Sequence, residues 1–374
     1  MLKLKRRTFL FQAIAALGQL GTGLPVLAAG SKSGRTKHAP SVTIAAGGDT
    51  VLGFNLQDHF DEQLAQGHSR DELYDLYFRG VHDVLDRADI AIVNLECPFT
   101  DRGDKLQKNF NFRARPEMIE VLKRGSIDAV TVANNHAMDY GATGMNDTRQ
   151  ILETAGIGHF GTGDNLQEAR QPLIIERNGL SIGFLGYYFQ NAEDMIEPRD
   201  IYALEDHPGV AGCYTDIEQM QAMLDEDITA LVPKVDAVIP FFHWGKEGKY
   251  VVRDYQIELA HRCVRLGARA VLGAHPHRLQ GVEVYRGAPV FYSLGNFVYG
   301  GVKNPPDTLT MIAQLHITRR HVSASIIPVQ YTSWPDAPFQ PFILNGEQRR
   351  QAIARIAGLS GNFRRTLPML RRRS

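Results

Sequence analysis

Short apolar runs typical of buried strands alternate with segments of helical periodicity along most of this chain. Five runs have the length and composition of strands in a sheet interior: 42–46, 90–93, 129–133, 237–242 and 269–272. Helical spacing of apolar residues occurs over 71–85, 145–155 and 256–266. Runs 173–177 and 180–185 flank Asn178-Gly179, a strong hairpin signal. Helical crossovers combined with hairpins predict an α/β or α+β sandwich with mixed sheets rather than a purely parallel sheet.

The N-terminal 29 residues have the organisation of an export signal. Arg6 and Arg7 precede an apolar stretch from Phe9 to about Leu20, and small residues follow up to Ala29. The pattern resembles a twin-arginine signal, which directs the export of folded proteins in bacteria. An uncleaved membrane anchor is the alternative, and only then would the protein contact a membrane. We therefore expect an exported protein in the periplasm or another extracytoplasmic space.

Four segments are expected along the chain: a signal peptide (1–29), a linker (30–41), one folded domain (42–330) and a C-terminal extension (331–374). Lys+Arg and Asp+Glu both total 41, so the formal net charge is zero. A nucleic-acid-binding protein usually has a basic excess, and we therefore expect no nucleic-acid partner. The chain has three cysteines, an odd number that does not form a disulfide framework. We therefore expect buried thiols.

Side chains that can bind a metal follow each of the five strand-like runs. In chain order they are Asp49; Asn94 and Glu96; Asn134, Asn135, His136 and Asp139; His243; and His275 and His277. Each group alone is more often a turn or a satisfied polar residue. Functional residues gather beyond the carboxyl ends of strands in open α/β sheets, so their shared position favours a common centre. Carboxylates, amide oxygens and imidazoles together suit one or two divalent ions such as Mn, Fe or Zn.

The order of these blocks resembles the metallophosphatase (calcineurin-like) superfamily. The more specific resemblance is to the poly-gamma-glutamate capsule-biosynthesis family, of CapA type. It spans about residues 42–299 and rests on six blocks: Gly48-Asp49, Asn94-Leu95-Glu96, Asn134-Asn135-His136, His243-Trp244-Gly245-x-Glu247, Gly273-x-His-Pro-His277 and Tyr292-Ser-Leu-Gly-Asn-Phe297. This resemblance implies a metallophosphatase-like sandwich of two mixed β-sheets flanked by helices.

The resemblance also implies roles for the metal-binding side chains. Glu96 would bridge two metals; Asn135, His243 and His275 would complete one site, and Asp49 and His277 the other. The superfamily usually has a histidine two residues after the first aspartate, where this chain has Val51. One metal would then have only three protein ligands, or a single metal would be held.

The residues at the reacting group follow from the same resemblance. His136 would act as an acid or an electrostatic stabiliser, and Asp139 would orient it. Independently of the resemblance, Lys108 and Arg113, between the second and third blocks, and the aromatic Trp244 are candidates for substrate binding, as is Asn94. A plain surface or packing role is the alternative for Lys108, Arg113 and Trp244.

The expected activity is metal-dependent hydrolysis, either phosphoesterase-like or directed at γ-amide bonds. The expected process is the synthesis or processing of capsular poly-gamma-glutamate or another cell-envelope polymer. Substrates would be an anionic polymer or a small phosphorylated or amide compound, and capsule machinery of the envelope would be the partner. The alternative is a non-catalytic assembly or polymer-binding factor on a degenerate metallophosphatase fold.

Overall fold

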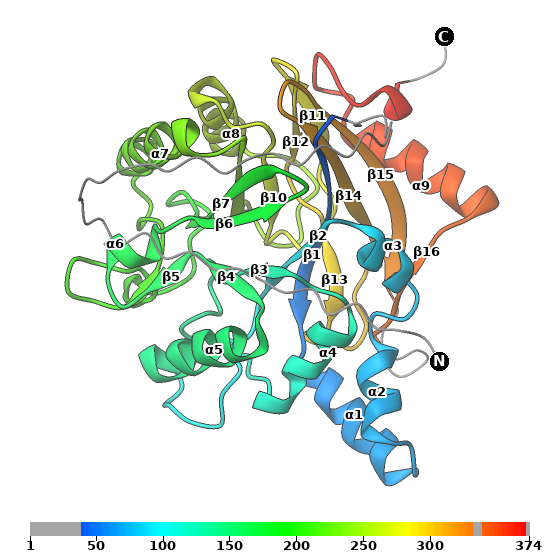
Figure 1. Ribbon diagram of the computed structural model, residues 1–374. Helices are drawn as coiled ribbons and strands as arrows, with labels where there is room; N and C mark the ends of the chain where they lie inside the picture. Colours follow the sequence, from blue (N-terminus) through cyan, green and yellow to red (C-terminus); the bar gives the residue numbers. More distant parts are fainter. Residues whose placement is uncertain (1–38, 332–338, 372–374) are drawn as a thin grey trace, which may run out of the picture.

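Two β-sheets pack face to face in the computed structural model, which describes residues 39–331 and 339–371 (Figure 1). The larger sheet has the order β16 (Pro341–Ile343), β15 (Val322–Tyr331), β14 (Leu309–Thr318), β1 (Ser41–Val51), β2 (Ile90–Leu95), β3 (Ala129–Thr131) and β4 (Gly158–Phe160), with β13 (Asn296–Tyr299) beside the end of β1. The smaller sheet has the order β10 (Leu272–Ala274), β9 (Ala237–Trp244), β7 (Leu180–Phe189) and β6 (Leu173–Arg177). Both combine parallel and antiparallel pairs.

Helices cover the outer face of each sheet. The larger sheet is covered by α1 (Asn55–Ala65), α2 (Arg70–Leu76), α3 (His82–Arg87), α4 (Ile119–Arg124) and α5 (Gly141–Ala155). The smaller sheet is covered by α7 (Ile217–Leu231) and α8 (Asp254–Leu266). Small pairs join β5 (Thr162–Gly163) to β8 (Gly209–Val210) and β11 (Val282–Tyr285) to β12 (Ala288–Phe291). The prediction of an α/β sandwich of two mixed sheets flanked by helices is confirmed, and the arrangement is consistent with a metallophosphatase-like sandwich.

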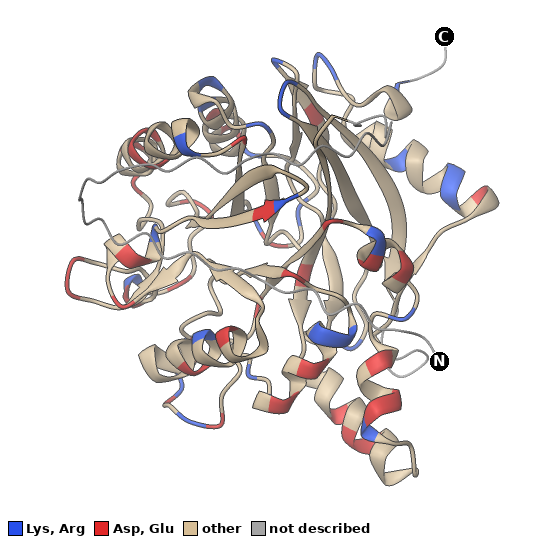
Figure 2. Cartoon of the chain, in the orientation of Figure 1, with Lys and Arg blue, Asp and Glu red and all other residues tan. Residues whose placement is uncertain are grey.

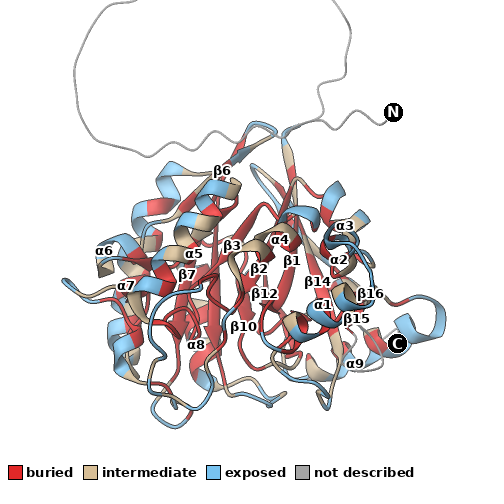
Figure 3. Cartoon of the chain, turned by 90° about the horizontal axis from the view of Figure 1, so that it is seen from below, coloured by how far each residue is buried: buried red, intermediate tan, exposed pale blue. Residues whose placement is uncertain are grey.

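Alternation of side chains along the strands divides the interior into separate cores. Ile44 of β1 and Ile92 of β2 face the core between the sheets, where they join Phe184 of β7. Ala45 and Val93 face the helical side. Successive residues of a strand point to opposite faces, so strands buried on both sides read as continuous apolar runs. Figure 3 shows the buried strands and the exposed outer sides of the helices. Each fully buried Ile or Phe contributes about 1.5–3 kcal/mol.

Most predicted elements are present, with different bounds. The hairpin of β6 and β7 turns at Asn178 (φ 50°) and Gly179 (φ 78°), the positive φ values that a type I′ turn requires. The helix expected over 71–85 is divided into α2 and α3, and the strand expected at 269–272 begins at Leu272. The helix α1 was not predicted.

The first strand is longer than the sequence indicated, because β1 continues through Gly47-Gly48 to Val51. The register with β2 shifts between Ala46 and Asp49, so the glycines form an irregularity rather than the end of the strand. A Cβ at Gly48 would lie 1.8 Å from the carbonyl oxygen of Gly295, and therefore only glycine allows β13 to pair here.

The C-terminal segment packs on the domain. Its strand β16 pairs with β15, and Ile356 of α9 (Gly346–Leu359) lies in the core between the sheets. Acidic residues predominate on α1 and α2, and basic residues on α9 (Figure 2). The predicted signal peptide (1–29) and most of the predicted linker lie outside the described residues. Among the helices that are described, none combines the length and apolar character needed to cross a membrane.

Candidate metal centre

The metal-binding side chains predicted from the sequence lie together where the two sheets meet. Asp49 belongs to β1, His243 belongs to β9, and Glu96 follows β2 directly. The backbone N–H of His275, just after β10, donates to the Asp49 carboxylate at 3.2 and 3.3 Å. Residues more than two hundred positions apart in the sequence are thus in direct contact.

The centre contains two groups of side chains that share Glu96. In the first, His243 Nε2 lies 3.2 Å from Glu96 Oε1 and 2.9 Å from His275 Nδ1. In the second, His277 Nδ1 lies 3.1 Å from Asp49 Oδ2, and its Nε2 lies 3.8 Å from Glu96 Oε1. Within each group the ligand atoms lie within 4.8 Å of one another, so each group could hold one metal ion. Asn135 extends the first group, because its Oδ1 lies 2.8 Å from His243 Nε2.

Glu96 provides the test of whether a cation fits. Its side chain is fully buried, and neither carboxylate oxygen accepts a hydrogen bond from the described residues. Burial, followed by the nearby charge of Asp49, raises the pKa of Glu96 well above its ordinary value. A buried carboxylate without hydrogen bonds is costly unless a counter-charge compensates it. A divalent cation between the two groups would supply that charge, and the donor set fits it.

The three imidazoles differ in charge. Burial, followed by the neighbouring imidazoles, lowers the pKa values of His243 and His275 well below the ordinary range, so both are neutral and suited to bind a metal. Burial also acts to lower the pKa of His277, but Glu96 and Asp49 together outweigh it and raise that pKa to about 10. The His277 imidazolium thus lies between the carboxyl groups of Asp49 and Glu96.

The backbone between β10 and the following loop is strained where it carries the paired histidines. His275 has φ 97° and His277 has φ 53°, both in the left-handed region. Such conformations cost about 1–3 kcal/mol each for residues other than glycine and are held by the surrounding structure. With Pro276 between them, the His277 imidazole is directed towards Asp49 and Glu96, and the His275 imidazole towards His243.

Amide side chains hold the metal-binding groups in place. Asn94 Nδ2 donates to Asp49 Oδ1 at 2.8 Å and lies 3.2 Å from His243 Nδ1, so Asn94 supports these residues from behind. Gln190 Nε2 lies 2.8 Å from His275 Nε2, which leaves Nδ1 of that ring towards the centre. Asn296 Oδ1 lies 2.9 Å from His277 Nδ1. Such contacts fix the tautomer and orientation of a metal-binding imidazole.

His136 and Asp139 form a pair beside the two groups. His136 Nδ1 lies 2.6 Å from Asp139 Oδ2, and the ring stacks on Phe112 with centroids 4.1 Å apart. His136 is almost fully buried, and burial is the main cause that lowers its pKa. The contact through Nδ1 leaves Nε2 as the atom that can exchange a proton with a bound molecule.

The other three predicted substrate-binding residues lie in three different environments. Trp244 lies on the opposite face of β9 from His243, where its Nε1 donates to the Tyr292 carbonyl within the core under α7 and α8. Arg113 is exposed, and its guanidinium lies 4.5 Å from the centroid of the Tyr140 ring. The Lys108 side chain is only 4% exposed and lies between Asp139 and Glu197.

Two supporting residues, Gln190 and Glu197, were missed by the sequence analysis. Both lie in or beside the irregular stretch after β7, which has no apolar period, and no sequence signal distinguishes them. Their importance comes from tertiary contacts with His275 and Asn135.

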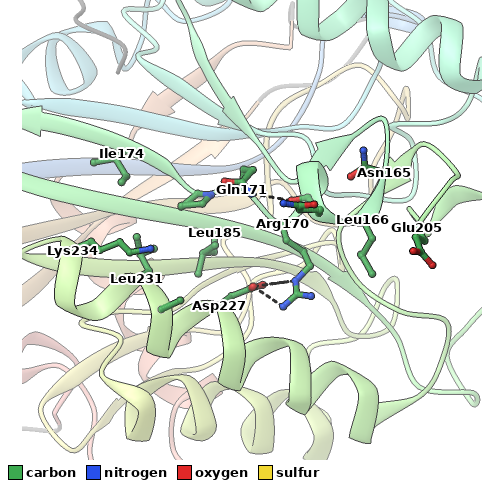
Figure 4. A pocket seen from close by; sticks show the side chains of 13 residues that line it. Asn165, Leu166, Arg170, Gln171, Ile174, Leu185, Glu205, Asp227, Leu231 and Lys234 are labelled. Carbon is green, nitrogen blue, oxygen red and sulfur yellow. Dashed lines mark hydrogen bonds and ion pairs between the residues drawn. The ribbon is translucent and has the colours of Figure 1, made fainter. Parts of the chain in front are cut away.

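A separate cavity of about 710 Å³ lies between α6 (Leu166–Ala169), β6 and α7. Its lining includes Arg170, Asp227 and Leu231, and none of the metal-binding residues (Figure 4). The guanidinium of Arg170 pairs with Asp227 at 2.7 Å and with Glu226 at 2.7 Å.

The fold and the centre define a class: an α/β sandwich whose sheet ends carry two carboxylate–imidazole groups joined by one glutamate. Residues 43–300 match the family described as "Bacterial capsule synthesis protein PGA_cap". The chain belongs to this family.

Curated relatives agree with this assignment. The chain is 32% identical over 255 residues to "PGA biosynthesis protein CapA" of Bacillus subtilis (strain 168), covering 67% of this chain and 62% of the relative. It is 31% identical over 232 residues to "Capsule biosynthesis protein CapA" of Bacillus anthracis, covering 60% of this chain and 54% of the relative. The match thus spans little more than half the length of these relatives. A solved structure of a hypothetical protein from Thermus thermophilus aligns with a TM-score of 0.47 at 16% identity, covering 76% of this chain and 99% of that chain.

Proposed function

We propose that this protein is an exported, metal-dependent hydrolase that acts in the synthesis or processing of capsular poly-gamma-glutamate or another envelope polymer. The family supports the process, and the centre supports the chemistry. The observation that carries the proposal is Glu96, a buried carboxylate that accepts no hydrogen bond from residues 39–331 and 339–371 and is shared by two potential metal-binding groups.

Six residues would hold the metal. Glu96, His243 and His275, with the Asn135 amide oxygen, would bind one divalent cation; Asp49, Glu96 and His277 would bind a second. Mn, Fe and Zn all accept such a mixed set of oxygen and nitrogen ligands. A cation bound there supplies Lewis acidity, which polarises a phosphoryl or amide carbonyl group and stabilises the charge that develops on it.

The residues of the chain then handle the proton. Hydrolysis adds water to the phosphorus or carbonyl carbon and breaks the bond to the leaving oxygen or nitrogen, which must take up a proton. In its protonated form His136 would give that proton from Nε2, because Asp139 holds its Nδ1 and the lowered pKa makes the imidazolium a stronger acid. Loss of such an acid typically costs about 10²–10⁴ in rate. The buried position of His136 against Phe112 restricts water around the ring.

Export and substrate class belong to the same proposal. The paired arginines ahead of an apolar stretch support export in the folded state, with any metal bound before translocation. The names of the Bacillus relatives, which refer to PGA biosynthesis and to capsule biosynthesis, support a capsule polymer as the substrate class. An anionic polymer would present carboxylates and amide carbonyls to the centre.

The test is elemental analysis of the protein purified without chelator, comparing wild type with Glu96→Ala and His275→Ala. We expect bound metal in the wild type and a large loss in both variants. Equal metal content in all three proteins would refute the metal centre. Turnover is then measured with poly-gamma-glutamate, by chain length, and with bis(4-nitrophenyl) phosphate, by released nitrophenol. Capsule formation that needs the protein but not His136 would instead identify a non-catalytic assembly factor.

A further inference from the structure

Three segments meet beside the first metal-binding group, and a buried lysine joins them. Lys108 Nζ lies 2.9 Å from Asp139 Oδ1 and 3.0 Å from Glu197 Oε2, and it donates to the backbone carbonyl of Asn135 at 2.6 Å. The Lys108 side chain is 4% exposed and that of Glu197 is 7% exposed. One cation and two carboxylates are therefore fixed together away from solvent.

Glu197 also determines which way the Asn135 amide points. Asn135 Nδ2 donates to Glu197 Oε1 at 3.1 Å. An ionised carboxylate can only accept hydrogen bonds, so it faces the NH₂ group of the amide and excludes the carbonyl. The side-chain amide oxygen of Asn135, Oδ1, must then face the other way, where it lies 2.8 Å from His243 Nε2. Only this orientation presents an oxygen to a cation, because an amide NH₂ is not a metal ligand.

We propose that Glu197 is a positioning residue that orients Asn135 as a metal ligand, and that Lys108 holds Glu197 in place while linking it to the His136–Asp139 pair. This inference rests on the proposed metal centre. Without Glu197, the amide is free to rotate by a half turn and to direct its NH₂ group towards His243. Residues that orient metal ligands through hydrogen bonds typically contribute about 10–100-fold to metal affinity.

The experiment must distinguish this role from one in which the ion pairs of Lys108 only hold the loops together. Four variants are compared with wild type: Glu197→Leu, Lys108→Met, the double variant of both, and the control Glu193→Leu. Glu193 is exposed on the same loop. The double variant keeps the net charge of the network, because it removes one positive and one negative group. Metal is stripped with chelator, Mn²⁺ affinity is measured by calorimetric titration, and the melting temperature of the metal-free protein is recorded.

We expect Glu197→Leu to weaken Mn²⁺ binding about 10–100-fold, and Glu193→Leu to leave it unchanged. Lys108→Met leaves two buried carboxylates without their cation, so its melting temperature falls. In the double variant only Asp139 is left without the lysine, so the melting temperature rises above that of Lys108→Met, but Mn²⁺ binding stays as weak as in Glu197→Leu. Recovery of Mn²⁺ affinity together with stability would show that the network only ties loops, and would overturn the inference.

The result for the wild type distinguishes the two proposals. If wild type and Glu193→Leu bind Mn²⁺ and Glu197→Leu binds it as tightly, the positioning role is wrong and the metal centre stands. If neither wild type nor Glu193→Leu binds Mn²⁺, the metal centre itself is wrong, and the role of Glu197 is refuted with it.

Discussion

The candidate metal centre and the cavity beside α7 bury charged side chains in different ways. In the cavity, the Asp227 carboxylate is paired with Arg170 and accepts a hydrogen bond from the Tyr187 hydroxyl at 2.7 Å. In the centre, Glu96 is more deeply buried and accepts no hydrogen bond from the described residues. At the cavity, the charges of Arg170 and Asp227 pair directly, whereas at the centre Glu96 lies 3.2 Å from His243 Nε2 and 3.8 Å from His277 Nε2 without accepting a hydrogen bond from the described residues.

The proposed reactive site is therefore distinguished by a buried carboxyl group without hydrogen bonds from the described residues, rather than by the volume of a cavity. Folding tolerates a buried unpaired carboxylate only where something else compensates it. Substitutions in the two regions should therefore act on different quantities: metal content and turnover at the centre, and stability alone at the cavity.

The largest contrast is expected from removing the shared carboxylate. Glu96→Gln should reduce bound metal to less than about a tenth of wild type, since one ligand of both groups loses its charge. The metal-free variant should be no less stable than metal-free wild type, because a buried amide costs less than a buried carboxylate. Elemental analysis and chemical denaturation measure the two effects. Glu226→Gln, at an exposed partner of the cavity residue Arg170, is the control. Wild-type metal content in Glu96→Gln would contradict the comparison.

Removing the proton donor should separate turnover from metal binding. His136→Gln is expected to lower turnover about 100-fold or more while bound metal stays at the wild-type level, because His136 contacts Asp139 rather than the two groups. Hydrolysis rates and elemental analysis of the same preparation measure both. Parallel loss of metal and turnover would make His136 a ligand instead.

A weaker effect is expected from Gln190, which supports His275 from behind. Gln190→Leu should lower Mn²⁺ affinity about 10-fold by freeing the imidazole to rotate. It should also destabilise the fold by about 1–3 kcal/mol, because the Tyr188 hydroxyl and the Gly245 carbonyl lose their partner. Gln171→Leu, on the cavity rim, is the control and should change neither value. Unchanged affinity in Gln190→Leu would show that His275 is held by other contacts.

The smallest effect is expected at the cavity. Arg170→Ala should lower the free energy of unfolding by about 1–3 kcal/mol at neutral pH and leave metal content unchanged. Burial raises the pKa of Asp227 while Arg170 opposes that rise, so the variant raises it further. A raised carboxyl pKa means that the folded state binds its proton more tightly and is favoured at low pH. The deficit relative to wild type should therefore shrink as pH falls towards about 4, the ordinary range of an aspartate pKa. Denaturation at both pH values tests this, and a constant deficit would contradict it.

The sandwich and the contacts of the metal-binding blocks could be predicted because both depend on local sequence patterns. Each strand is an apolar run, and His243 and His275 stand at or just beyond the end of one. Trp244 could also have been placed correctly, since neighbours in a strand face opposite sides and His243 already faces the centre. Glu197 could not, because its position depends on where the loop after β7 crosses Lys108.

Gly48 has a consequence for how this centre can change over time. Its single hydrogen lets β13 lie against β1, and β13 carries Asn296, the partner of His277. A methyl group at position 48 would have to displace the backbone of Gly295, and with it the support of one half of the centre. Gly48 has no side chain that could bind a ligand, yet it limits which substitutions the centre can accept. The histidines can be replaced only while β1 and β13 stay this close.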